Sequence, residues 1–152
     1  MTRWLTVLLP MAALTVLLAG CEEADSRPLA QVYMTEHCAC CRDWVNYLEE
    51  EAFEVEAHYV DQRQLNDLKR EAGLDFNLSS CHSAHIEGYF VEGHVPAEDI
   101  RRMLAEQPDI TGITVPGMPI GSPGMERGDQ QDEYRVIAFD DQGNREVFAE
   151  HP

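Results

Sequence analysis

The order of the strand and helix patterns after residue 28 restricts the possible folds more than any other feature of this sequence. Apolar runs that suit strands and apolar spacings that suit helices follow one another as β-α-β-α-β-β-α. The strands are expected at residues 29–34, 55–60, 84–86 and 89–91, and the helices at 42–53, 62–72 and 96–104. Strands that alternate with helices in this way predict parallel pairing through right-handed connections.

This element order is that of a thioredoxin-like fold, so we predict an α/β domain with a small mixed sheet and flanking helices. Residues 112–128 hold five glycines and three prolines, which predicts a fixed irregular loop. The strand patterns at residues 133–139 and 146–149 flank a turn sequence and predict a C-terminal β-hairpin. We expect residues 29–150 to form one domain.

The beginning of the chain is predicted to be a targeting segment. One basic residue precedes an apolar stretch, residues 4–18, that is too short to span a bilayer comfortably. The stretch ends in Leu18-Ala19-Gly20-Cys21, which resembles the bacterial lipobox, in which the cysteine is acylated and becomes the new N-terminus. We predict a lipoprotein signal peptide over residues 1–21 and a polar tether over residues 22–28. An ordinary signal peptide with a chance cysteine is the alternative.

Acyl chains on Cys21 would attach the protein to a membrane surface. The next residue is Glu22 and not aspartate, which by resemblance to enterobacterial sorting favours the outer membrane. The prediction is therefore a lipid-anchored protein of the cell envelope that faces the periplasm.

The composition excludes one large class of partners. Hydrophobic residues make up 44% of the chain and charged residues 26%, which is an ordinary globular balance. The formal net charge of −17 is not ordinary, and a chain this negative repels phosphate backbones. Nucleic acid is therefore not an expected partner.

The remaining cysteines are expected to meet at one end of the sheet. The first strand leads to Cys38, Cys40 and Cys41 at the start of the first helix, where backbone N–H groups stabilise a thiolate. The third strand runs back, so Cys81 and His82 at its start lie at the same end, and His94 follows the fourth strand there.

The spacing of these cysteines indicates redox or metal chemistry. Cys38 and Cys41 form C-x-x-C, and Cys40 adds a thiol that can bridge two metal ions. Thiolate and imidazole suit Cu(I) or zinc, and Met118 and Met125 could add thioether ligands or simply fill gaps in the loop. Glu92 could orient His94 by a hydrogen bond, or it is an exposed carboxylate of a strand.

With these motifs in view, the chain resembles the CopG-type copper-resistance proteins, the thioredoxin-like family also called domain of unknown function 411. The matching segments are Cys38-Ala39-Cys40-Cys41, Ser80-Cys81-His82, residues 88–96 and residues 115–126. The resemblance covers residues 29 to about 150. It implies periplasmic copper binding in copper tolerance, and a copper-linked redox role.

Two functions from different classes remain in view. The first is a copper-binding protein that holds Cu(I) through the C-x-C-C loop and the Cys-His pair, for sequestration, relay or copper-linked redox. The second is a thiol–disulfide oxidoreductase that uses Cys38 and Cys41. The second is disfavoured because Cys81-His82-Ser83 stands where such enzymes carry a cis-proline before the third strand. Binding is favoured over catalysis, and no catalytic residue or protein partner is predicted. Structural disulfides are a third, weaker interpretation, because short loops gain little from cross-linking.

Overall fold

The computed structural model describes residues 27–152. The predicted signal peptide, Cys21 and nearly all of the tether lie outside the described residues. Between residues 27 and 152 there is no helix of the length and apolar character needed to cross a membrane.

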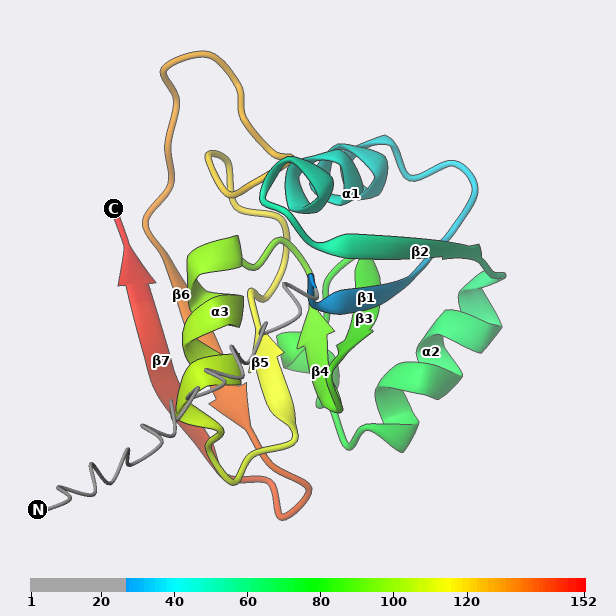
Figure 1. Cartoon of the computed structure of the whole chain (residues 1–152), viewed down its shortest axis with the longest axis vertical. Coiled ribbons are helices and arrows are strands. Elements are labelled where there is room, and N and C mark those ends of the chain that lie inside the picture. Colours follow the sequence, from blue (N-terminus) through cyan, green and yellow to red (C-terminus); the bar gives the residue numbers. More distant parts are fainter. Residues whose placement is uncertain (1–26) are drawn as a thin grey trace, which may run out of the picture.

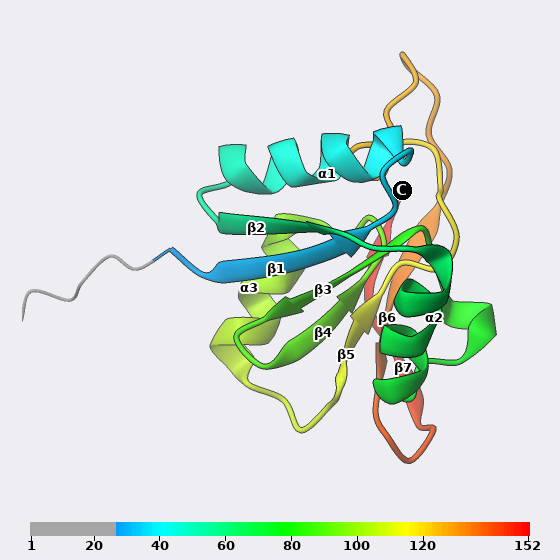
Figure 2. The same cartoon turned by 90° about the vertical axis from the view of Figure 1, so that its right-hand side faces the viewer.

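The described chain forms a mixed α/β fold around one seven-stranded sheet (Figures 1 and 2). In spatial order the strands run β2-β1-β3-β4-β5-β6-β7, and only the β1/β2 and β4/β5 pairs are parallel. The elements are β1 (Leu29–Met34), α1 (Ala39–Glu50), β2 (Glu54–Tyr59), α2 (Gln62–Glu71), the 3-10 helix η1 (Phe76–Leu78), β3 (His82–Ile86), β4 (Tyr89–Glu92), α3 (Ala97–Glu106), β5 (Gly112–Thr114), β6 (Tyr134–Phe139) and β7 (Arg145–His151).

The α/β class, the element order through α3 and the C-terminal hairpin are confirmed. The thioredoxin-like label stays a prediction that depends on this order. Asp61 begins α2 as expected: its carboxylate accepts the Gln64 backbone N–H at 2.8 Å, and the Gln64 side chain accepts the Asp61 N–H at 3.0 Å. This reciprocal capping box satisfies two donors that a helix start otherwise leaves unpaired.

Two local predictions are wrong. Helix α1 begins at Ala39 and not at residue 42, because Cys41 already belongs to the buried stripe that continues through Trp44, Val45 and Leu48. Cys40 and Cys41 therefore lie in its first turn, and Cys38 is the N-cap residue. The first three residues of the loop expected at 112–128 form strand β5 instead. Gly112 makes that pairing possible, since a Cβ there would lie 1.8 Å from the carbonyl oxygen of Phe90.

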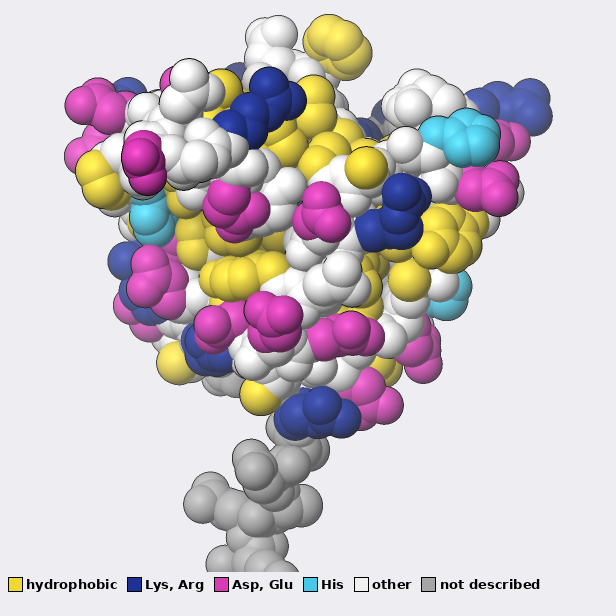
Figure 3. All heavy atoms as spheres, turned by 90° about the horizontal axis from the view of Figure 1, so that it is seen from above, with side chains coloured by type: hydrophobic (Ala, Val, Ile, Leu, Met, Phe, Trp, Pro, Cys, Tyr) yellow, Lys and Arg dark blue, Asp and Glu magenta, His cyan; other side chains and the backbone are white. Residues whose placement is uncertain are grey.

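The core lies on both faces of the sheet. Neighbouring strand residues point to opposite faces, so Val91 joins the large cluster with α1 and α3, while Phe90 joins Leu74, Leu78 and Phe139 in a smaller one. Seen from above Figure 1, acidic side chains are spread over the surface, with hydrophobic ones between them (Figure 3). The large cluster therefore holds β1, β3 and β4 from one face, while the smaller cluster packs on the other face at β4 and β6.

Candidate metal centre

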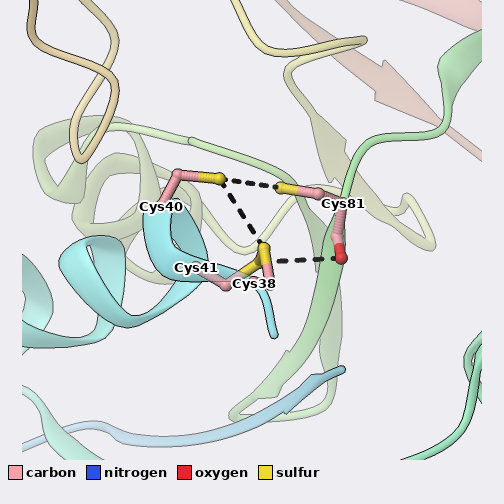
Figure 4. Close-up of side chains that lie close together, drawn as sticks. All are labelled: Cys38, Cys40, Cys41 and Cys81. Carbon is pink, nitrogen blue, oxygen red and sulfur yellow. Dashed lines mark hydrogen bonds between the residues drawn. A yellow bond between two sulfur atoms is a disulfide. The ribbon is translucent and has the colours of Figure 1, made fainter. Parts of the chain in front are cut away.

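Three segments far apart in the sequence meet at one end of the sheet. Cys38 caps the N-terminus of α1, and Cys40 and Cys41 occupy its first turn. Strands β1 and β3 are antiparallel with Met34 opposite His82, so the end of β1 and the start of β3 lie together. Figure 4 shows the result, with Cys40 and Cys41 on α1 facing Cys81.

The four sulfur atoms form a continuous group. Cys38 and Cys41 are joined by a disulfide, whereas Cys40 and Cys81 are free thiols. The Cys40 sulfur lies 3.6 Å from that of Cys38 and 3.9 Å from that of Cys81. Burial, followed by the neighbouring Cys40, raises the pKa of Cys81 to about 12, so this thiol is protonated at neutral pH.

His94 presents one defined nitrogen to this group. Its Nδ1–H donates to the carbonyl oxygen of Pro123 at 2.8 Å, because a carbonyl can only accept. The lone pair of Nε2 therefore faces the Cys81 sulfur, 3.2 Å away. Burial lowers the pKa of His94, which keeps the imidazole neutral and able to bind a metal ion.

His82 is as fully buried as His94. Its ring centroid lies 4.4 Å from that of Trp44, and its Nδ1 lies 3.4 Å from the Cys81 sulfur. Its Nε2 is buried without a hydrogen-bond partner, and burial holds the pKa of His82 well below its usual value. A neutral imidazole beside a thiol, with an unpaired nitrogen, is a suitable donor for a soft metal ion.

The loop between β5 and β6 covers the first turn of α1. Gly124 packs so closely against α1 that a Cβ would lie 2.7 Å from the Trp44 backbone nitrogen and 3.0 Å from the Cys40 carbonyl oxygen. Met118 of this loop is 52% exposed, and Met125 is tied by a backbone hydrogen bond to Ser122. The thioether role predicted for Met118 and Met125 stays a prediction.

The predicted cysteines and histidines divide into two overlapping groups with ligand atoms within 4.8 Å of one another. One group is Cys38, Cys40, Cys41 and Cys81, and the other is Cys81, His82 and His94. Cys81 belongs to both. The donor set of thiol sulfur and imidazole nitrogen fits copper or zinc, and a thiol ligand must lose its proton on binding.

Glu92 neither orients His94 nor lies exposed, so both interpretations given for it are wrong. Its side chain is fully buried and its carboxylate accepts from Lys69, Ser80 and Ser83, and not from His94. Burial raises the pKa of Glu92, and the Lys69 ammonium opposes that shift. Sequence reasoning did not place Lys69 in the interior, although its spacing of four residues from Leu65 puts it on the buried side of α2.

A further histidine, His151, pairs with a carboxylate and not with the sulfur atoms. His151 in β7 lies 2.7 Å from the Asp99 carboxylate of α3, and with Glu98 these residues form a third group of possible ligands. Asp99 and His151 are already paired with each other. The contact ties the last strand to α3.

The fold and the donor atoms define a class of protein: a mixed α/β domain with a partly buried cysteine and histidine cluster compatible with metal binding. Residues 78–125 match the family described as "Protein of unknown function, DUF411". No curated protein matches. Two solved structures of copper resistance protein CopG, forms 2 and 1, are 43% and 44% identical in sequence, each with a TM-score of 0.76. The matches cover 83% and 82% of this chain and 99% and 97% of the CopG chains. The chain belongs to the CopG-type copper resistance family.

Proposed function

We propose that this protein binds copper as Cu(I) at the cysteine and histidine cluster and contributes to copper tolerance of the cell envelope. The observation that carries the proposal is the position of Cys81, whose sulfur lies within 3.9 Å of both the Cys40 sulfur and the His94 Nε2. Sulfur and imidazole donors at these separations suit a soft monovalent ion. The names of the CopG structures support copper over zinc.

The disulfide links copper binding to redox state. While Cys38 and Cys41 are bonded to each other, Cys40 and Cys81 are the only thiols among residues 27–152. Reduction with two electrons and two protons converts the disulfide into two further thiols. We therefore expect the reduced protein to hold more copper than the oxidised protein, which allows sequestration, relay or copper-linked redox at the same site.

The test is anaerobic Cu(I) loading of the full chain, purified in detergent, in reduced and oxidised form. Copper retained against a moderate chromophoric chelator is measured by elemental analysis, with zinc measured in the same samples. Retention by the reduced form and a lower copper content in the oxidised form are expected. Loss of all copper from the reduced form would contradict the proposal.

The Cys38–Cys41 disulfide at the start of α1 also favours a second candidate, thiol–disulfide oxidoreductase activity. Backbone N–H groups at a helix N-terminus stabilise an attacking thiolate. Reduction of a model disulfide by the metal-free protein, abolished in Cys38→Ser, would support this function. We expect that activity to be weak, because the adjacent Cys40 thiol competes for the same sulfur at 3.6 Å.

For location, we propose that acylation at Cys21 holds the protein in the envelope facing the periplasm, with Glu22 favouring the outer membrane. The support is the lipobox-like sequence Leu18-Ala19-Gly20-Cys21.

A further inference from the structure

A buried ion pair joins helix α2 to strand β4 beside the segment that carries Cys81. The Lys69 ammonium lies 2.6 Å from the Glu92 carboxylate, with side-chain exposures of 7% and 0%. Lys69 is the only lysine of the chain. Burying both charges costs solvation that their attraction often does not repay, so such a pair is weak evidence for stability alone.

The ion pair holds both backbone polar groups of Ser80. The Ser80 N–H donates to Glu92 Oε1 at 2.6 Å, and Lys69 Nζ donates to the Ser80 carbonyl oxygen at 2.6 Å. The other Glu92 oxygen accepts the Ser83 hydroxyl at 2.6 Å. One carboxylate thereby holds the chain on both sides of Cys81, through the backbone N–H of Ser80 and the side-chain hydroxyl of Ser83.

Glu92 is also close in the sequence to His94, which belongs to the group of Cys81, His82 and His94. Glu92 ends β4, and His94 is two residues further on. The Gly93 N–H donates to the His82 carbonyl oxygen at 3.0 Å, and a Cβ on Gly93 would lie 2.5 Å from the Ser80 Cβ. The Ser80–Cys81 and Gly93–His94 segments therefore pack directly against each other.

We propose that Lys69 and Glu92 are positioning residues for the metal centre: they hold Ser80 so that the Cys81 sulfur stays within reach of both the Cys40 sulfur and His94 Nε2. The inference rests on the proposed function, because it assigns these residues to copper binding. Neither residue offers an atom to the metal ion. Their contribution is geometric, since ligands that sit in place before the ion arrives bind it more tightly.

The test compares Cu(I) affinity in folded variants of the reduced full chain in detergent. Lys69→Met leaves a buried carboxylate unpaired, so the double variant Lys69→Met/Glu92→Gln is made as well, in which both groups are neutral and similar in size. Circular dichroism melting first establishes a temperature at which each variant is fully folded. At that temperature we expect the dissociation constant for Cu(I) to rise about tenfold or more in the double variant.

The matched control is Arg70→Met, which removes a positive charge from the neighbouring position of α2. Arg70 pairs with Asp67 at the surface, with 73% of its side chain exposed, so its loss should leave the Cu(I) dissociation constant unchanged. A purely structural role would lower the melting temperature of the double variant but keep wild-type affinity, which would overturn the positioning role alone. Failure of the wild type to retain Cu(I) would instead overturn the proposed function, and this inference with it.

Discussion

Cys81 has more contacts with possible metal ligands than any other residue of the described cluster. Its sulfur faces a sulfur of α1 on one side and the imidazoles of His82 and His94 on the other. Removal of this one sulfur separates the other three cysteines from the two histidines, which makes Cys81 the most informative single position.

The variant Cys81→Ser is expected to fold and to lose Cu(I) affinity by about tenfold or more, because a thiolate is replaced by a protonated hydroxyl. Cys81 lies at the edge of the core, so the free energy of unfolding should change little. Melting by circular dichroism and chelator competition on the same sample separate the two effects. Unchanged affinity in a folded protein would remove Cys81 from the site, and lost stability with unchanged affinity would indicate a packing role.

The protonated state of Cys81 leads to a pH prediction. A pKa of about 12 leaves almost no thiolate at pH 8, so iodoacetamide should modify Cys81 at least about tenfold more slowly in the folded protein than after unfolding. The rate should still be rising at pH 10, because the thiolate fraction increases until pH passes the pKa. Mass spectrometry of the Cys81 peptide, with the Cys38–Cys41 disulfide intact, follows the reaction. A rate that levels off near pH 9 would contradict this assignment.

At the scale of elements, the loop between β5 and β6 positions the site from outside. Its Pro123 carbonyl orients His94, and its Gly124 touches the first turn of α1. Gly124 has a φ of +80°, a left-handed conformation that other residues adopt only with strain.

Gly124→Ala should therefore lower the free energy of unfolding by about 1–3 kcal/mol, through backbone strain and the clash with Trp44 and Cys40. Gly128→Ala is the matched control, since Gly128 also has a positive φ, +58°, but has no atom within 4 Å of an added Cβ. Urea unfolding of both variants measures the difference. Equal losses would show that strain alone matters and that the loop does not press on α1.

At the scale of the whole molecule, the predicted lipid anchor determines the compartment in which the protein would bind copper. The test is Cys21→Ser in the full chain, followed by fractionation of the cell envelope. We expect the wild type in the membrane fraction and the variant in the soluble fraction, because two acyl chains give stable attachment and none gives no attachment. Intact mass adds a direct measure, since acylation increases it. Equal fractionation and an unmodified mass in the wild type would contradict the anchor.

The class of fold and the meeting of the cysteines could be predicted from the sequence because both depend on short-range patterns. Strand and helix periods establish the element order, and an antiparallel β3 then brings Cys81 to the end of β1. The predicted metal ligands Cys38, Cys40, Cys41, Cys81, His82 and His94 do lie together in space, while their binding of copper stays a proposal.

The remaining features depend on contacts between residues distant in the sequence. Nothing local to Lys69 or Glu92 shows that they pair, and the partner of each buried charge is decided only when α2 packs on the sheet against β3. The strand β5 likewise forms because β4 offers an open edge and Gly112 allows close approach. The glycine and proline content of residues 112–128 predicted a loop there instead. Sequence patterns determined most of the elements, all but β5 among the strands, and which donors are present. Tertiary packing decided which donor atoms face each other, because distance and burial exist only in the folded chain.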